Sequence, residues 1–357
     1  MRDTSKRAPL YTLMIKYREI GLCIIIALLI GVVALRNAQF ASFDNLLFIV
    51  EDTAIMAILA AGMLCVLLVG SIDISISAIM ALSAMVTGVI MRSNLTSTDV
   101  TQIVEGAETL ITVRESLPMG LLILIGVATG TLIGLVNGLI IAYGKVLPIV
   151  TTLGMQYIVY GLCHIVSNST AVYRKDMSDA FFEFTRVEPL GIDSKIWIML
   201  FVYVALMIFI TYFRRGRHLY AVGSNMEAAR MRGIPVDRTI VMAHVIMGAL
   251  AALAGLLYAS RDTKITQDMA NGYEMYVIAA CVIGGVSVTG GSGKIWGVLL
   301  GAMTIGVINN ALTMLRLTGN SEFWKKAIQG ALILIAVVSN VVLQRTMDRQ
   351  NLRRRNI

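Results

Sequence analysis

The sequence predicts an all-α, polytopic membrane protein with about ten transmembrane helices, and three observations lead to that prediction. Of the 357 residues, 57% are hydrophobic and only 15% are charged. A soluble domain of this size carries roughly a quarter charged residues. The charged residues also avoid long stretches, which leaves many apolar runs near the ~20 residues that a membrane helix needs. We therefore expect residues 1–357 to form a single transmembrane domain, without a separate soluble catalytic domain.

The individual spans follow from reading the apolar runs against the segments that interrupt them. The first run follows a basic start and has no small-residue cleavage site behind it, so we expect a retained anchor helix instead of a signal peptide. Later interruptions are the long segments 92–118 and 168–195 and the arginine-rich segment 214–238. The predicted spans are 20–36, 45–70, 74–91, 119–142, 147–167, 196–213, 239–260, 273–289, 294–315 and 323–343.

The distribution of basic residues predicts the orientation. An even number of spans puts both termini on one side of the membrane, and the positive-inside tendency makes that side the cytoplasm. The opposite orientation would leave segment 214–238 and the tail Arg353-Arg354-Arg355 outside. The net charge of +8 is explained by this flanking of membrane spans, so no nucleic-acid partner is expected. The outer segments 92–118 and 168–195 are either solvated caps or a docking site for a soluble protein.

Local patterns recur between the two halves of the chain. Ala61-Gly62-Met63-Leu64 resembles Ala254-Gly255-Leu256-Leu257, and Gly134-Leu135-Val136-Asn137 resembles Gly306-Val307-Ile308-Asn309. A shift of five helices reverses membrane direction, so helices 2–5 and 7–10 are predicted to form an inverted repeat. Such repeats are common in transporters, and this one favours a carrier over an enzyme.

A short helix is predicted over 224–233, between two long apolar spans. Ser224 and Glu227 have the spacing of a capping box, and Gly233 can adopt the left-handed conformation that ends a helix. Pro235 prevents the helix from resuming. Its small-residue face and the surrounding arginines suit a helix that a partner protein grips outside the bilayer. The candidate coupling residues are Gly223, Ser224, Asn225, Glu227, Ala228, Ala229, Arg230 and Gly233.

A polar residue at membrane depth is expected to have a hydrogen-bond partner or a functional role, because an unpaired polar group there costs several kcal/mol. Asp73, in the polar segment that contains Ser75, either caps the helix that follows or faces a water-filled cavity. Asn137, Asn309 and Asn310 either hold helices together through hydrogen bonds or line a permeation route. Glu274 is expected to be structural, in the first turn of its helix. The candidates for a translocation path or helix break are Asp73, Ser75, Asn137, Asn309 and Asn310.

The glycine clusters predict tight turns and close helix packing, not a binding or catalytic site. Gly284-Gly285 and Gly290-Gly291-Ser292-Gly293 permit a tight turn, and they lack the lysine of a phosphate-binding loop. Gly297 and Gly301 form a GxxxG pair, which allows close helix packing or a dimer seam.

Nothing in the sequence indicates a catalytic or metal site. The cysteines Cys23, Cys65, Cys163 and Cys281 lack CxxC spacing and are expected to be buried small hydrophobes. His164, His218 and His244 show no ligand spacing and are expected to be structural. A nucleophile elbow, an HExxH motif and a paired set of carboxylates are all missing.

With these residues in view, the chain resembles the membrane permeases of bacterial ATP-binding-cassette importers, in the monosaccharide branch with the ribose, xylose, rhamnose and autoinducer-2 permeases. Glu227-Ala228-Ala229 followed by Gly233 matches the EAA-x-x-x-G element of these permeases, with Gly223 and Asn225 before it as in that branch. Gly70–Ser75 and Glu274–Gly293 are similar to two further signatures of the branch, and the likeness runs from Asn45 to Val342. Ser71 and Ser77 depart from the pattern, which usually has glycine there.

The resemblance implies a permease subunit in the bacterial inner membrane that hydrolyses nothing and binds no cofactor. A separate cytoplasmic ATPase would bind ATP and magnesium, and an extracytoplasmic binding protein would deliver a small sugar, autoinducer-2-like carbohydrates included. A second permease, identical or homologous, would complete the pathway within the lipid bilayer. The alternatives are a permease of the same fold for branched-chain amino acids or nucleosides, and an ion-coupled secondary carrier.

Overall fold

The computed structural model describes residues 18–104 and 107–315, together with residues 327, 330, 331, 334 and 338. Seven helices in this part are long and apolar enough to cross a membrane. They are α3 (Phe43–Leu68), α4 (Ile76–Ser93), α5 (Met119–Ala142), α6 (Pro148–Ser167), α8 (Ser194–Tyr212), α11 (Val236–Asp262) and α13 (Ile295–Met314). Two shorter apolar helices, α2 (Arg18–Ala34) and α12 (Tyr273–Ile283), accompany them.

These helices confirm an all-α, polytopic membrane protein, and each corresponds to a predicted span. The last predicted span, 323–343, lies almost entirely outside the described residues. The count of about ten spans and the inverted repeat therefore stay predictions.

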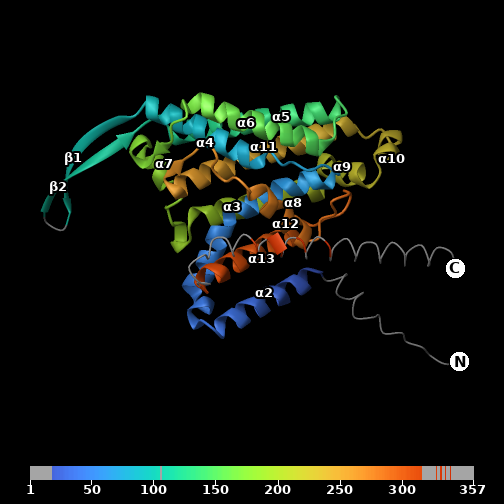
Figure 1. Ribbon diagram of the computed structural model, residues 1–357, viewed down its shortest axis with the longest axis horizontal. Coiled ribbons are helices and arrows are strands. Elements are labelled where there is room, and N and C mark those ends of the chain that lie inside the picture. Colours follow the sequence, from blue (N-terminus) through green and yellow to red (C-terminus); the bar gives the residue numbers. More distant parts are fainter. Residues whose placement is uncertain are drawn as a thin grey trace.

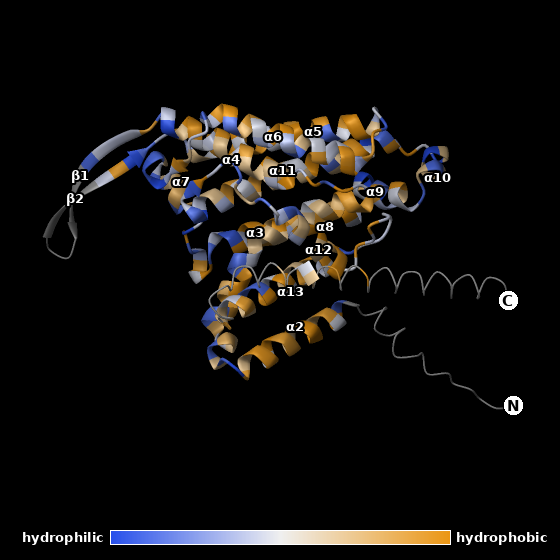
Figure 2. Cartoon of the chain, in the orientation of Figure 1, coloured by the Kyte–Doolittle hydropathy of each residue, from blue (hydrophilic) through white to orange (hydrophobic). Residues whose placement is uncertain are grey.

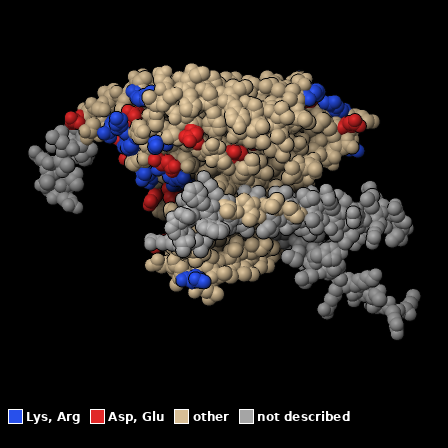
Figure 3. Space-filling model, viewed as in Figure 1, with Lys and Arg blue, Asp and Glu red and all other residues tan. Residues whose placement is uncertain are grey.

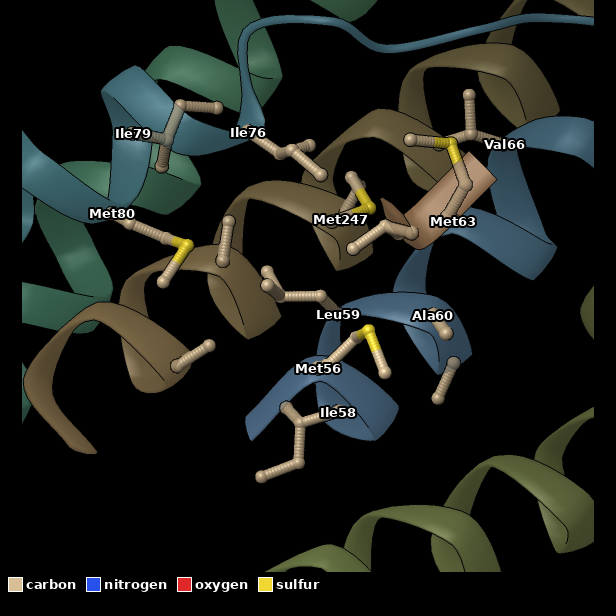
Figure 4. Close-up of a cluster of buried hydrophobic side chains, with 14 of the residues drawn as sticks. Met56, Ile58, Leu59, Ala60, Met63, Val66, Ile76, Ile79, Met80 and Met247 are labelled. Carbon is tan, nitrogen blue, oxygen red and sulfur yellow. The ribbon is translucent and has the colours of Figure 1, made fainter. Parts of the chain in front are cut away.

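Helix α3 is the centre of the fold. Every residue from Thr53 to Leu68 is buried, because α11, α13, α8 and α12 all pack around this helix. Figure 4 shows the side chains that meet there, with Met56 and Met63 from α3 close to Met80 from α4 and Met247 from α11. The unbranched methionine side chains fill the irregular spaces between the crossing helices.

The outer helices α5, α6 and α8 turn apolar side chains outward. Leu124, Ile165 and Phe201 are 64%, 71% and 74% exposed, and Figure 2 shows hydrophobic residues along these helices. Most charged side chains on the visible face gather toward the two ends of the long axis (Figure 3). An apolar surface between two charged ends is what a lipid bilayer covers.

Glycines on α5 bring that helix against α11. A Cβ on Gly130 would lie 2.4 Å from the Gly248 carbonyl oxygen, and one on Gly134 would lie 2.2 Å from the His244 carbonyl oxygen. Gly126 and Gly138 continue the same face, one turn away on each side. Small residues at this spacing let two helix backbones approach closely within a membrane.

Two expectations about the second half were wrong. Helix α12 ends at Ile283 instead of residue 289, because Gly285 adopts a left-handed backbone (φ +94°) that a helix cannot continue through. Gly297 and Gly301 do pack closely on a neighbouring helix as predicted, but they do not form a dimer seam. A Cβ on Gly301 would lie 2.0 Å from the Ala280 carbonyl oxygen, so this face packs on α12 of the same chain.

The two ends of the molecule carry short elements, of which the sequence analysis predicted only the helix within 224–233. At one end β1 (Thr96–Val104) pairs antiparallel with β2 (Ala107–Glu115), beside the short helix α7 (Asp179–Glu183). At the other end lie α9 (Arg214–Ser224) and α10 (Met226–Met231) (Figure 1). The remaining short elements are η1 (Ala38–Ala41), η2 (Arg174–Asp176), η3 (Pro189–Gly191) and the pair β3 (Val172–Tyr173) and β4 (Lys264–Ile265).

The cysteine prediction holds for three of the positions. Cys65, Cys163 and Cys281 are buried and free, whereas Cys23 is exposed on α2. The expectation of burial was wrong for Cys23 because α2 lies at the edge of the bundle, packed mainly against α13 and η1.

Candidate functional site

The predicted short helix exists as α10, but its start differs from the expected capping box. Ser224 is the last residue of α9, and Asn225 is the N-cap of α10 with an extended backbone (φ −160°, ψ 108°). The Asn225 Oδ1 accepts a hydrogen bond from the Ala228 N–H at 2.8 Å. The Ser224 prediction was wrong because α9 runs up to the turn and uses Ser224 as a helical residue.

The C-terminal end of α10 is closed as predicted. Gly233 is left-handed (φ +77°), its N–H donates to the Arg230 carbonyl oxygen at 2.9 Å, and Ile234 donates to the Ala229 carbonyl oxygen at 3.0 Å. These two bonds form a Schellman motif, which only a residue tolerant of positive φ completes without strain. Pro235 then precedes α11, which starts at Val236.

Helix α10 presents most of its side chains to the outside. Glu227, Ala228 and Arg230 are exposed, and Met231 is 88% exposed, while Ala229 is buried against the body. Asp237, in the first turn of α11, accepts from Arg230 Nη2 at 3.1 Å and from Lys145 Nζ at 2.6 Å. The helix is therefore fixed at its base and open on its outer face.

Gly223, also among the predicted residues, lies inside a close contact. A Cβ on Gly223 would lie 1.8 Å from the Leu68 carbonyl oxygen and 2.5 Å from the Gly291 nitrogen. The end of α9 thus touches the end of α3 and the loop between α12 and α13 directly through backbone atoms.

The structure joins three of the predicted intramembrane residues into one buried cluster. Asp73 Oδ1 accepts from the Ser75 N–H at 2.9 Å and from Ser75 Oγ at 2.6 Å. Asn137 Nδ2, from α5, donates to Ser75 Oγ at 2.9 Å. All three side chains are completely shielded from solvent. Asp73 therefore closes a local turn onto Ser75 and takes part in helix–helix contacts. It does not cap α4 as one of the two interpretations expected, because Ser75 is the N-cap and the helix start has no side-chain cap.

His244 completes the cluster, and the sequence analysis missed its role. Its Nδ1 forms a hydrogen bond with Asp73 Oδ2 at 3.2 Å, and the side chain is fully buried on α11. The His244 Nε2 and Asn137 Oδ1 atoms have no hydrogen-bond partner within the described part of the chain. No local signal connects residues 171 positions apart. An acid in a membrane span is nonetheless a reason to search for a basic partner in another span.

The backbone around Asp73 is non-helical and is satisfied by α6. The Ile74 N–H donates to Thr152 Oγ1 at 3.1 Å, and Thr152 Oγ1 donates to the Ile72 carbonyl oxygen at 3.3 Å. Irregular backbone at membrane depth is tolerated only where protein or a cavity satisfies it. Thr152 of α6 does so here, and the Asp73 carboxyl group satisfies the Ser75 N–H.

The remaining polar candidates lie elsewhere. Asn309 and Asn310 are half-buried on α13, which packs against α3, α12 and α2, and the structure does not bring them into the Asp73 cluster. Glu274 lies in the first turn of α12 as predicted and accepts a hydrogen bond from Ser77 Oγ of α4. Within residues 18–104 and 107–315, no group of three or more His, Cys, Asp and Glu side chains is placed to hold a metal ion.

The end that carries the hairpin has its own polar contacts. Asp179 Oδ2 accepts from the Arg114 N–H at 2.7 Å, and Asp179 Oδ1 pairs with Arg174, which ties β2 to α7 and η2. Partial burial acts to raise the pKa of Asp179. The Arg114 N–H and the Arg174 guanidinium outweigh it, so the pKa lies below the ordinary value of 3.8. Arg174 and Arg186 also lie 4.0 and 4.1 Å from the centre of the Phe182 ring, so two guanidinium groups pack on one aromatic side chain at this end.

Comparison with known proteins places this architecture in a family. The family model described as the branched-chain amino acid transport system / permease component matches residues 45–337. The ribose import permease protein of Escherichia coli (strain K12) is 32% identical over 317 residues, covering 88% of this chain and 91% of the relative. No solved structure matches the chain significantly.

Two further relatives point the same way. The galactose/methyl galactoside import permease protein of Salmonella typhimurium (strain LT2) is 30% identical over 340 residues, covering 90% of this chain and 93% of the relative. The L-arabinose transport system permease protein of Escherichia coli (strain K12) is 33% identical over 320 residues, covering 90% of this chain and 89% of the relative. These relatives confirm the resemblance to the sugar branch. Because the family model and the relatives each cover most of its length, the chain belongs to the family of permease components typified by branched-chain amino acid transport systems.

Proposed function

We propose that this chain is the membrane-spanning permease subunit of an ATP-driven importer in the bacterial inner membrane, and that it carries a monosaccharide into the cell. The similarity to permeases named for ribose, galactose and L-arabinose supports the substrate class. ATP and magnesium belong to a cytoplasmic ATPase partner, and an extracytoplasmic binding protein delivers the sugar. A second permease copy or a homologue completes the assembly.

The observation that carries this proposal is α10. A helix of this kind, capped at both ends, fixed through Asp237 and exposed on its outer face, suits attachment of a separate motor protein. Asn225 and Gly233 set its two ends, and Ala229 seats it on the body. Glu227, Ala228 and Arg230 would then contact the ATPase.

The attachment is tested by charge reversal on the exposed face. Glu227→Lys should abolish co-purification of the ATPase subunit and substrate uptake, while leaving the amount of chain in the membrane unchanged. Glu188→Lys, an equally exposed reversal beyond α7, is the matched control and should retain the ATPase. Normal ATPase recovery with Glu227→Lys would contradict the coupling role of α10.

The substrate class is tested with named probes. Vesicles that contain the permease, its ATPase and its binding protein should accumulate at least one of radiolabelled ribose, galactose and L-arabinose when ATP is supplied. Leucine and adenosine probe the amino-acid and nucleoside alternatives, and accumulation of either in place of the sugars would contradict the proposal. Accumulation by the permease alone would favour an ion-coupled carrier.

The orientation is tested by labelling from outside. In a chain with Cys23→Ser, we expect Ser97→Cys on β1 to react with a membrane-impermeant maleimide in intact cells. Met231→Cys on α10 should react only after the membrane is opened, because α10 and both termini are proposed to be cytoplasmic. The reverse pattern would place α10 outside, where no ATPase can reach it.

The proposal also assigns roles to the two remaining groups of residues. The end formed by the hairpin and α7, opposite α10 (Figure 1), is proposed to receive the binding protein through its charged and aromatic side chains, among them Arg174, Phe182 and Arg186. Asp73, Ser75 and Asn137 are proposed to control the pathway near the α10 end, together with His244. Asn309 and Asn310 would contribute a separate polar stretch on α13.

A further inference from the structure

Four glycines from three separate segments meet next to α10. Gly70 follows α3, Gly223 lies near the end of α9, and Gly290 and Gly291 lie in the loop between α12 and α13. We call these four residues the glycine junction. Gly70, Gly290 and Gly291 have positive φ angles of +75°, +93° and +73°. Because L side chains rarely adopt such angles, the backbone path itself favours glycine at these three positions.

The junction is made of backbone-to-backbone contacts. The Gly291 N–H donates to the Leu68 carbonyl oxygen at 3.0 Å. A Cβ on Gly290 would lie 2.9 Å from the Gly70 nitrogen and 3.0 Å from the Gly223 Cα, and one on Gly291 would lie 2.8 Å from the Ser224 Cα. A Cβ on Gly223 would lie 1.8 Å from the Leu68 carbonyl oxygen, so Gly223, Gly290 and Gly291 leave no room for a side chain between the segments. A Cβ on Gly70 would lie 3.3 Å from the Thr289 carbonyl oxygen, and there the positive φ is what favours glycine.

Helix α9 is held to the same loop by a side chain. Tyr220 Oη donates to the Gly293 carbonyl oxygen at 2.9 Å, and Leu219 and Val222 are buried on the same helix. Within the loop, the Ser287 N–H donates to the Ser292 carbonyl oxygen at 2.8 Å, which closes the turn that presents Gly290 and Gly291. Helix α9 and the loop therefore behave as one unit at this point.

The chain order connects this unit to α10. Only Asn225 separates the end of α9 from the start of α10. On the other side of the junction lie α3, which is the central buried helix, and α12 and α13, which pack on it. A contact through side chains could absorb a displacement by changing rotamers, whereas contacting backbones cannot.

From this arrangement we propose that the glycine junction is the positioning element through which a movement of α10 reaches α3, α12 and α13. The inference rests on the proposed function, because it takes α10 as the site where the ATPase acts. Tyr220 serves the junction by fastening α9 to the loop. These residues are proposed to act without contacting the transported molecule. Each transmits a displacement of α10 to the helices on the other side of the junction.

The test measures whether a change at α10 arrives at the far end of α3. Spin labels on Phe43→Cys, at the start of α3, and Ile165→Cys, near the end of α6, report the separation of these helices, and both sites are exposed. The measurement uses the permease–ATPase complex in lipid, in a Cys23→Ser background, before and after ATP and vanadate are added. The variants are Gly223→Ala and the milder Tyr220→Phe. The matched control is Gly154→Ala on α6, where a Cβ would meet nothing within 4 Å.

We expect the parent and Gly154→Ala to show a nucleotide-dependent change in the label separation. Gly223→Ala should lose it and Tyr220→Phe should reduce it, while Tyr220→Phe retains ATPase co-purification and ATP hydrolysis. If Tyr220→Phe and every folded Gly223 variant keep the full change, the junction proposal is overturned. If the parent chain retains no ATPase at all, the proposed function itself fails, and this result is separate from the label measurement.

Discussion

Asp73 Oδ2 and His244 Nδ1 lie 3.2 Å apart, and both side chains are completely buried. The pair joins the irregular segment before α4 to α11, beside the face where α5 and α11 approach through glycines. His244 is about two turns into α11 from its α10 end. The pair therefore ties the irregular segment before α4 to α11 about two helical turns from α10.

Removing His244 should destabilise the protein strongly. His244→Ala leaves the buried Asp73 carboxyl group with Ser75 as its one remaining side-chain partner, and leaving a buried polar group without its hydrogen bond costs about 1 to 3 kcal/mol, or more when the group is charged. Asp73→Asn should cost less, and the double variant should be more stable than His244→Ala alone. Thermal unfolding in detergent measures the difference, with the exposed His164→Ala as control. Equal unfolding temperatures for His244→Ala and His164→Ala would show that the pair contributes nothing.

The two candidate caps of α10 can be separated by substitution. Asn225→Ala removes the acceptor of the Ala228 N–H and should destabilise α10 by about 1 kcal/mol. Ser224→Ala removes no cap and, within α9, should change stability by less than about 0.5 kcal/mol. Amide hydrogen exchange at Ala228 measures both effects, because an uncapped first turn opens more often. Faster exchange in Ser224→Ala than in Asn225→Ala would restore the capping-box interpretation.

Sequence reasoning identified the spans because burial in lipid demands long apolar runs, and α3, α5 and α11 lie within a few residues of their predicted bounds. It also identified Gly233, since a helix that stops before proline needs a left-handed residue. It misplaced the N-cap because Ser224 and Asn225 both suit that position, and only the extent of α9 decides between them. His244 was missed since its pairing with Asp73 is tertiary. The glycines at every fourth position of α5, from Gly126 to Gly138, are a sequence signal for the close approach of α5 and α11.

The glycine face of α5 should tolerate no added side chain. A Cβ on Gly134 would lie 2.2 Å from the His244 carbonyl oxygen, so Gly134→Ala must push α5 away from α11. Overpacking of this kind costs about 1 to 3 kcal/mol, and it should also disturb the neighbouring Asp73–His244 pair. Gly120→Ala, on the same helix with nothing within 4 Å of its Cβ, is the matched control. Comparable unfolding temperatures for the two variants would contradict the close approach of these helices.

Acid should release the hairpin from α7 before it unfolds the helices. Partial burial raises the pKa of Asp179, and the Arg114 N–H and Arg174 outweigh that effect, so the folded pKa lies below the ordinary 3.8. For a carboxyl with a depressed pKa, the stabilisation is complete above the unfolded pKa and is lost as pH falls through the folded one. The contact between β2 and α7 should therefore be constant from neutral pH down to about pH 5 and weaken below about pH 4.

Hydrogen exchange of the Arg114 amide, corrected for the intrinsic pH dependence of exchange, follows this contact directly because that N–H donates to Asp179 Oδ2. In Asp179→Asn the carboxylate that titrates is gone, so exchange at Arg114 should be faster at neutral pH and should no longer change through the acid range. Glu183→Gln, at the end of the same short helix, is the control and should keep the pH dependence of the parent. If Asp179→Asn kept the acid transition of the parent, a group other than Asp179 would have to cause that transition. Titration of Asp179 predicts instead that the substitution removes it.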